Sequence, residues 1–341
     1  MTAETSLAAR AHELARDLLV PDPRVYWSDL MLTTLALYVS LGLAITSRAP
    51  GLALLAGAVC VLALYRAISF IHELTHLRAD AMPGFHLAWN VLVGVPFLTP
   101  SLLYEGVHIL HHARDRYGTA RDPEYHPLAR LPPHHTALFL GAAALAPVGV
   151  VLRFAVLTPL SFLWPPLRRQ VLGRLSAMTI NPRFTREDLA FPLAWRAQEI
   201  ACWLWSWTLA ALALSGGLAT RAVLTGAAVM AVATFVNQLR TLVAHAWESD
   251  GAPMSLAEQF RDSINVPPPG WLPLLWAPVG LRYHALHHLA PRVPYHNLAE
   301  AHRRLCRELD EASVYHESTH RHLSMLIARL AKSTMGKRAK A

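Results

Sequence analysis

Two long apolar runs near the N-terminus restrict the fold of this chain more than any other feature of its sequence. Residues 30–46 and 52–70 approach the roughly 20 apolar residues that a helix needs to cross the hydrocarbon core of a bilayer. Arg66 is the one charged residue within them. Pro50 and Gly51 lie in the short segment between the runs and favour a turn. We therefore predict a helical hairpin whose two ends lie on the same side of a membrane.

A second pair of apolar runs repeats this arrangement closer to the C-terminus. Residues 203–215 and 222–236, both extended by apolar neighbours, are separated by a turn that begins with Gly216 and Gly217. Only 16% of all residues are charged, whereas soluble domains usually carry about 25%. The sequence therefore predicts an all-α integral membrane protein with four transmembrane helices in two hairpins.

Two shorter apolar stretches, residues 87–103 and 136–164, lie between the hairpins, and prolines interrupt both. A proline removes a helical hydrogen bond, so these stretches suit re-entrant or interfacial helices. Several arginines follow the second stretch, and short loops rich in Lys and Arg usually face the cytoplasm. We therefore expect a cytoplasmic cap that holds the histidines described below, with both termini on that side. The net charge of +8 fits this rule better than a nucleic-acid surface.

These features divide the chain into three parts. We predict a cytoplasmic N-terminal segment at residues 1–29, a membrane domain at residues 30–305 and a basic cytoplasmic tail at residues 306–341. The acids and bases before residue 30 do not resemble the charged and apolar regions of a cleaved signal peptide.

Histidines form three tight clusters within the membrane domain. The clusters are His72 and His76; His108, His111 and His112; and His284, His287 and His288. Residues three and four apart lie on one face of a helix, so each cluster offers its imidazoles side by side. Neutral imidazole binds iron, zinc and copper, and eight nitrogens exceed the about four ligands of a zinc site. A lone histidine is usually an ordinary polar residue, but three clusters at the ends of apolar runs predict a site for two metals.

The three clusters resemble the histidine boxes of the membrane fatty-acid desaturase/hydroxylase superfamily. The resemblance continues in Asp122, Pro123 and Glu124 after the second cluster. After the third cluster it continues through two prolines to Tyr295, Asn297 and Leu298, and in all it covers about residues 26–305. It implies a non-haem di-iron centre, dioxygen as co-substrate, and no catalytic residue beyond the metal ligands. It also implies a ninth ligand between the second and third boxes, where His245 follows an apolar run.

The resemblance implies oxidation of an unactivated C–H bond in a lipid chain. We predict a fatty-acid (acyl lipid) desaturase that introduces a double bond, with a lipid hydroxylase that uses the same di-iron site as the alternative. The sequence has no His-Pro-Gly-Gly haem motif, so the electrons would come from a separate ferredoxin or cytochrome system. The histidine boxes define the metal site but not the product.

Two other classes of function remain open from the residues alone. His72, Glu73 and His76 form the His-Glu-x-x-His motif in which two histidines bind zinc and the glutamate acts as base, so a membrane zinc protease is a distant alternative. A membrane receptor that uses the histidines as a metal sensor is the third class. Neither requires two three-histidine boxes.

Further polar residues are candidates to support the metal ligands. Glu73, Asp122 and Glu124 could orient imidazoles through hydrogen bonds, although Asp122 also suits an ordinary turn before Pro123. Three others lie close in sequence to the third box or to the ninth ligand: Asn237, Arg240 and Arg282. The two arginines would pair with those carboxylates, with the headgroup of a substrate or with lipid phosphate.

Overall fold

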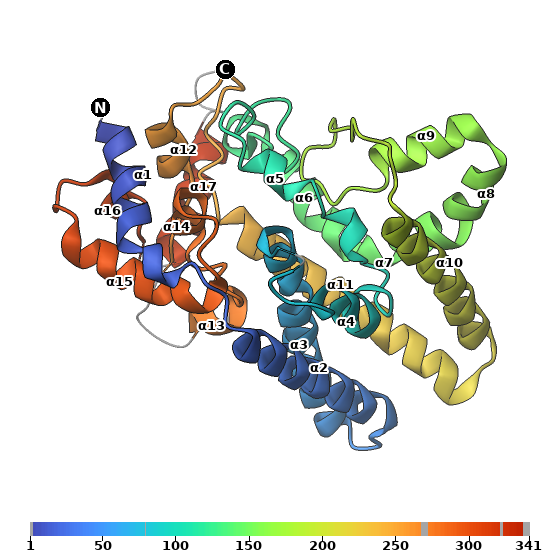
Figure 1. The fold of residues 1–341 in the computed structure, drawn as a ribbon. Helices are drawn as coiled ribbons and strands as arrows, with labels where there is room; N and C mark the ends of the chain where they lie inside the picture. The colour runs from blue at the N-terminus through green and yellow to red at the C-terminus, as the bar shows by residue number, and fades with distance from the viewer. Residues whose placement is uncertain (1–2, 79, 267–271, 321–322, 337–341) are drawn as a thin grey trace.

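The structure is a computed structural model that describes residues 3–78, 80–266, 272–320 and 323–336 (Figure 1). The basic end of the tail, residues 337–341, lies outside the described residues. Within the described ranges the chain is all-α as predicted, with isolated β-bridges but no β-strand. The longer helices are α1 (Ala3–Leu14), α2 (Pro23–Thr46), α3 (Pro50–His76), α6 (Pro133–Ala144), α9 (Pro165–Arg174), α10 (Leu193–Leu214), α11 (Gly217–Leu242), α15 (Leu298–Glu308) and α17 (Leu323–Gly336). The shorter helices are α4 (Phe85–Trp89), α5 (His108–His111), α7 (Ala146–Val151), α8 (Thr158–Leu163), α12 (Leu256–Asp262), α13 (Leu272–Trp276), α14 (His284–Leu289) and α16 (Val314–Glu317).

The first apolar pair folds into two adjacent long helices, α2 and α3, which lie side by side (Figure 1). The Asp22 side chain caps α2 by accepting a hydrogen bond from the Arg24 backbone, and Pro23 and Pro50 occupy first turns, where a missing N–H is tolerated. Arg66 on α3 donates to Asp29 on α2, which neutralises the one charge in the apolar runs. The second pair, α10 and α11, packs together beyond the turn at Gly216 and Gly217.

Within the described ranges, four helical stretches are long and apolar enough to cross a membrane: α2, α3, Ala146–Leu163 and α11. Three of them coincide with predicted crossings. The third differs, because Ala146–Leu163 lies in the stretch that we expected to be re-entrant, whereas α10 does not reach this combination of length and hydropathy. The finding supports an integral membrane protein and leaves the predicted pairing of crossings and the cytoplasmic cap as proposals.

The stretch Ala146–Leu163 stays helical despite its prolines and contains a π-helical turn at Leu152–Leu157. Pro159 cannot donate to the carbonyl of Ala155, four residues earlier. The indole Nε1 of Trp207 on α10 donates to that carbonyl instead, at 3.1 Å. A neighbouring helix therefore satisfies the group that the proline leaves without its helical donor.

Buried charges also join this region to α10. Glu199 is fully buried and accepts hydrogen bonds from Arg153 at 2.8 Å and from both terminal nitrogens of Arg168 at 2.8 and 2.7 Å. The Arg153 guanidinium also donates to Ser176 and to the Leu175 carbonyl, so its hydrogen-bonding groups are well supplied with acceptors. These polar contacts satisfy Glu199, one of the two charged residues of α10.

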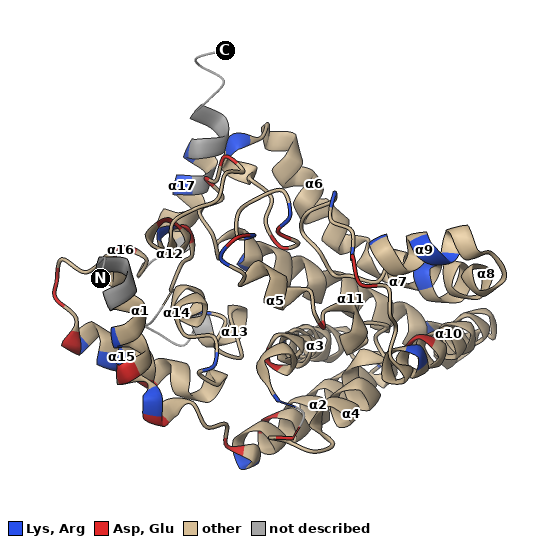
Figure 2. Ribbon diagram, turned by 45° about the horizontal axis from the view of Figure 1, so that its top comes forward, with Lys and Arg blue, Asp and Glu red and all other residues tan. Residues whose placement is uncertain are grey.

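The short helices α12, α14, α15 and α16 pack with α1 around a second apolar cluster, which includes Phe260, Leu286 and Tyr315. Figure 2 shows few charged residues along α3 and α11, whereas α15 carries both signs on its surface. Tyr26 of α2 joins the long helices to the short ones, because its hydroxyl donates to Glu73 of α3 at 2.5 Å and its ring packs edge-on against Tyr295. The histidine clusters lie where these two parts of the chain meet.

Candidate metal centre

Three short helical segments deliver the clustered histidines. His72 and His76 occupy the last turns of α3, which continues past the apolar run to His76. The second cluster begins α5 and the third begins α14, and both helices are barely longer than one turn. Since residues three and four apart share a helix face, each segment presents its imidazoles to the same space.

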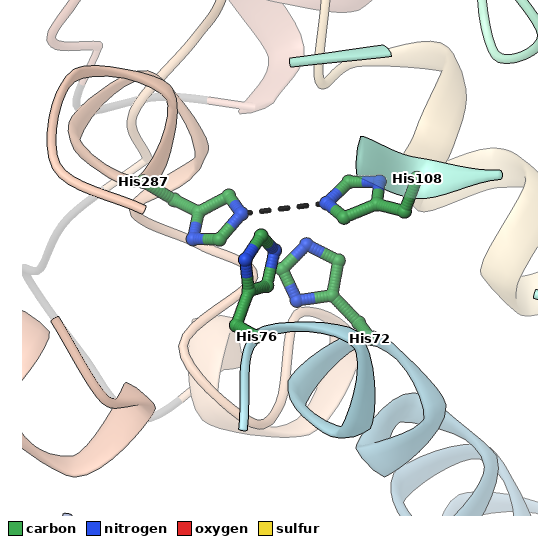
Figure 3. Close-up of side chains that lie close together, drawn as sticks. All are labelled: His72, His76, His108 and His287. Atoms are coloured by element: carbon green, nitrogen blue, oxygen red, sulfur yellow. Dashed lines mark hydrogen bonds between the residues drawn. The ribbon is translucent and has the colours of Figure 1, made fainter. Parts of the chain in front are cut away.

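The first histidine group consists of His72, His76, His108 and His287 (Figure 3). One ring nitrogen from each lies within 4.8 Å of those of the other three. Figure 3 shows the rings of His72 and His76 rising from α3 between His108 and His287, which approach from either side. Three of the four side chains are buried, and His76 is partly buried.

The second histidine group consists of His111, His245, His284 and His288. Their ring nitrogens also lie within 4.8 Å of one another. The Nε2 atom of His284 lies 2.9 Å from that of His245 and 3.1 Å from that of His288. The structure therefore brings His245, which follows α11, into the same group as members of both three-histidine boxes.

His112 lies between the two groups. Its Nε2 atom is 2.9 Å from Nε2 of His108 and 3.0 Å from Nε2 of His287, both members of the first group. Its ring stacks on that of His288 in the second group, with centroids 4.3 Å apart. All nine predicted ligands thus converge on one region of the molecule.

The hydrogen bonding of these rings fits metal ions. Among the described residues, buried ring nitrogens without a hydrogen-bond partner occur in both groups: His72 Nδ1 and Nε2 and His76 Nε2 in the first, and His111 Nε2 in the second. Buried polar atoms normally find partners, and imidazole nitrogens that converge within ligand distance of a common point are a favourable donor set for a transition metal. Four nitrogens in each group suit one metal per group.

Burial keeps most of these imidazoles in the form that binds metal. It lowers the pKa of His108, His287 and His288 well below the usual value, and their histidine neighbours lower it further. His111 is the exception: burial acts to lower its pKa, but the carboxylates of Asp122, Glu124 and Asp262 together outweigh that effect and raise it. A neutral imidazole has a free lone pair, so these rings can bind a cation without first losing a proton.

Carboxylates orient imidazoles in both groups. Nδ1 of His111 lies 2.9 Å from each oxygen of Asp122, which is fully buried. Nδ1 of His108 lies 2.8 Å from Glu124, and burial raises the pKa of Glu124 to about 7 although His111 and Tyr104 oppose this shift. Such partners select the tautomer that leaves Nε2 free for a metal.

The remaining predicted supporting residues occupy different positions. Glu73 lies 3.9 Å from His72 Nδ1, and its Oε2 accepts hydrogen bonds from the Tyr26 hydroxyl and the Tyr295 backbone. Asn237 and Arg240 line a cavity beside both histidine groups. Arg282 is buried but does not line that cavity. Its guanidinium lies 5.1 Å from the centre of the Tyr283 ring.

Three supporting residues were not predicted from the sequence. Asp262 lies 3.4 Å from His245 Nδ1, and the Tyr117 hydroxyl contacts both Asp262 at 3.0 Å and His245 Nδ1 at 2.9 Å. Tyr104 donates to Glu124 at 2.7 Å beside His108. Tyr117 lies 145 residues before Asp262 in the chain, His245 belongs to a different segment, and no motif surrounds Asp262, so no local signal could identify it.

Comparison with known proteins agrees with this geometry. Residues 49–320, which include all nine clustered histidines, match the fatty acid desaturase family. A ceramide hydroxylase from Caulobacter vibrioides (strain NA1000 / CB15N) is 52% identical over 339 residues, which cover 99% of this chain and 97% of that protein. The chain therefore belongs to the fatty acid desaturase family, a di-iron family of membrane oxidoreductases that act on lipids.

Proposed function

We propose that this chain is a membrane-bound ceramide hydroxylase whose di-iron centre is held by nine histidines. The observation that carries the proposal is the 52% identity to a ceramide hydroxylase along almost the whole of both chains. The two histidine groups, with a cavity beside them, provide the site at which such a reaction would take place. The comparison favours our alternative interpretation, hydroxylation, over the desaturation that we predicted first.

The chain's own residues prepare the site for this chemistry. The first group would hold one iron and the second group the other, with His112 next to the first and between the two. Asp122, Glu124 and Asp262 would hold the rings in the tautomer that binds metal. Bound iron would supply the activation of dioxygen and the power to oxidise an unactivated C–H bond.

The overall reaction requires an electron donor. In hydroxylation, one atom of dioxygen enters a C–H bond of the ceramide and the other leaves as water, with two electrons and two protons consumed. We propose that a separate ferredoxin or cytochrome supplies the electrons. We propose that the histidines and both termini face the cytoplasm, where such carriers are found.

Desaturation remains the second candidate, because the family that the chain matches is named for it. It uses the same dioxygen and electrons but removes two hydrogens from the lipid and releases both oxygen atoms as water. The zinc-protease alternative has less support, because Oε2 of Glu73 is engaged by Tyr26 and the Tyr295 backbone rather than offered to a substrate water.

Lipid mass spectrometry separates these candidates. Cells that make ceramide would express either the chain or the variant His287→Ala, under dioxygen enriched in a heavy oxygen isotope. We expect ceramide that has gained one heavy oxygen atom, and only with the unaltered chain. Ceramide or another acyl lipid that has lost two hydrogens would instead establish the desaturase. Unchanged lipids despite a full metal complement and a working electron donor would contradict both.

A further inference from the structure

A cavity of about 340 Å³ lies beside both histidine groups. His72 and His108 of the first group line it together with His245 and His284 of the second. Its remaining wall comes mainly from the last turns of α11, from α3 and from residues 178–180, with a smaller part from α6. A lipid whose reacting carbon reached the histidines from this cavity would place its neighbouring polar atoms against the end of α11.

Arg240 contributes a guanidinium group to the wall of this cavity. It lies in the last turn of α11, and its Nη2 donates to Oδ1 of Asn237 at 2.9 Å, which holds the planar group in place. Its Nε atom is buried and has no hydrogen-bond partner in the part of the chain that the structure describes. A buried N–H without an acceptor is unfavourable, so an oxygen atom that entered the cavity would satisfy a group that the protein leaves unpaired.

The charges of the cavity wall limit the chemistry of that oxygen. Glu124 is the carboxylate among the residues that line the cavity, and it already accepts hydrogen bonds from His108 at 2.8 Å and from Tyr104 at 2.7 Å. A phosphate or a free carboxylate in this cavity would therefore meet a second acidic group on the same wall. The wall therefore suits a neutral polar group, such as an amide carbonyl or a hydroxyl, better than a phosphate or a free carboxylate.

We propose that Arg240, positioned by Asn237, determines substrate specificity by donating a hydrogen bond from Nε to the amide carbonyl of the lipid. This contact places the carbons beside the amide next to the two histidine groups. The inference rests on the proposed function, because ceramide is an amide-linked lipid. Arg240 thus acts on binding and selectivity rather than on the metal centre.

The test compares Arg240→Met with two other variants in the iron-loaded, full-length protein. Arg240→Lys keeps the charge but loses the donor at Nε. Arg221→Met removes an exposed arginine at the opposite end of the same helix. The substrates are a short-chain ceramide and its isostere in which a trans alkene replaces the amide. The measurements are kcat, KM, iron content, and the rise in unfolding temperature on adding the ceramide without dioxygen.

We expect the unaltered protein to favour the amide over the isostere by about tenfold to a hundredfold in kcat/KM, the value of one hydrogen bond to a charged group. Arg240→Met should abolish that preference, mainly through KM, and should abolish the thermal shift while keeping its iron. Arg240→Lys should recover only part of the preference, and Arg221→Met should behave like the unaltered protein.

Three results would overturn the inference, and they differ from a failure of the proposed reaction. A preference that survives in Arg240→Met would exclude the contact. Loss of iron from Arg240→Met would instead assign the residue to the metal centre. Equal loss of the thermal shift in Arg221→Met would show a general effect of removing an arginine.

If the ceramide binds in an Arg240-dependent manner but the product is an alkene, the specificity proposal stands and hydroxylation fails. If ceramide neither raises the unfolding temperature of the unaltered protein nor reacts with it, both the specificity proposal and the proposed function fail.

Discussion

His111 donates the hydrogen on its Nδ1 to Asp122, and both oxygens of that carboxylate lie 2.9 Å from the nitrogen. A carboxylate can only accept, so the contact directs the Nε2 lone pair of His111 toward the second histidine group. Asp122 is itself held by the backbone N–H groups of Gly118 at 2.8 Å and Glu124 at 2.9 Å. The loop after the second box therefore supports His111, a proposed metal ligand, through a chain of hydrogen bonds.

Asp122→Asn should weaken metal binding without removing a ligand. An amide accepts less strongly than a carboxylate, so the imidazole becomes less basic and less well oriented, and metal affinity should fall about tenfold to a hundredfold. Release of iron to a chelator, followed over time, measures the effect. Asp115→Asn is the matched control, because the Asp115 side chain is 72% exposed on the same segment and lies 3.5 Å from the Arg121 guanidinium. Equal iron release from both variants would contradict the assignment.

Single substitutions should distinguish the two histidine groups. We expect the purified protein to hold about one iron in each group, by analogy with sites in which about four protein ligands hold one metal. His76→Ala, in the first group, and His245→Ala, in the second, should each reduce the iron content and abolish lipid oxidation. His134→Ala, outside both groups, should retain the full content. Elemental analysis of the iron content per chain measures these differences. A full iron content in His245→Ala would exclude His245 as a ligand.

The fully buried Glu199 should be important for stability rather than for chemistry. Glu199→Gln would leave the guanidinium groups of Arg153 and Arg168 without the carboxylate that they share. Breaking a buried ion pair usually costs about 3–5 kcal/mol. Unfolding of the detergent-solubilised protein should therefore occur at a lower temperature, whereas Glu187→Gln, with its side chain 77% exposed, should change little. An unchanged unfolding temperature in Glu199→Gln would show that the ion-pair network contributes nothing.

Gly280→Ala should disturb the approach to the third box. Gly280 has a φ of +71°, and an added Cβ would lie 2.6 Å from the side chain of Leu298 and 3.0 Å from that of Tyr295. Substitution at a positive φ alone destabilises by more than about 1 kcal/mol, and the close contact adds to this. We expect a lower unfolding temperature and partial iron loss. Gly141→Ala is the control, because nothing lies within 4 Å of its added Cβ and it sits in the helix α6.

The metal-free protein should lose stability on acidification. Burial lowers the pKa of the following site histidines in the folded chain: His108, His112, His245, His284, His287 and His288. The unfolded chain, with histidine pKa values of about 6.5, then binds more protons below that pH, so stability falls as pH falls. His111 and Glu124, whose pKa values are raised, act in the opposite direction but are fewer.

Unfolding temperatures of the chelated protein between about pH 8 and pH 5 test this expectation, since the lowered pKa values lie below the reference of about 6.5. The iron-loaded protein should show a smaller decline near neutral pH, because bound metal excludes protons from the rings. A metal-free protein that is more stable at the acidic end would contradict the assignment of neutral, buried imidazoles.

The sequence predicts the long helices because each contains a continuous apolar run, and it predicts the histidine clusters because their spacing is local. The prolines of residues 136–164 led us to predict a re-entrant segment, whereas Ala146–Leu163 is a continuous helical stretch. It contains a π-helical turn, and the indole of Trp207 donates to the carbonyl that Pro159 leaves without its helical donor. That contact joins residues 52 positions apart, so it cannot be inferred from the local pattern. Asp262 was missed for the same reason, because its partners Tyr117 and His245 come from other segments.

The boxes themselves do not correspond to the histidine groups. Local spacing suggests that each box is a unit, yet α5 gives His108 to one group and His111 to the other. Likewise α14 gives His287 to the first group and His284 and His288 to the second. Only the packing of α3, α5, α14 and the end of α11 decides which nitrogens meet.

This sharing of helices makes the two halves of the centre interdependent. A metal ion that orders α5 and α14 for the first group also orders the ligands of the second, so the entropy of arranging both helices is lost at the first binding step. The second ion then binds to a prearranged site, and loading should be positively cooperative. At limiting metal, the population should divide into empty and fully loaded molecules, with few singly occupied ones. A cell that runs short of iron would then hold fewer working enzymes rather than many half-assembled ones.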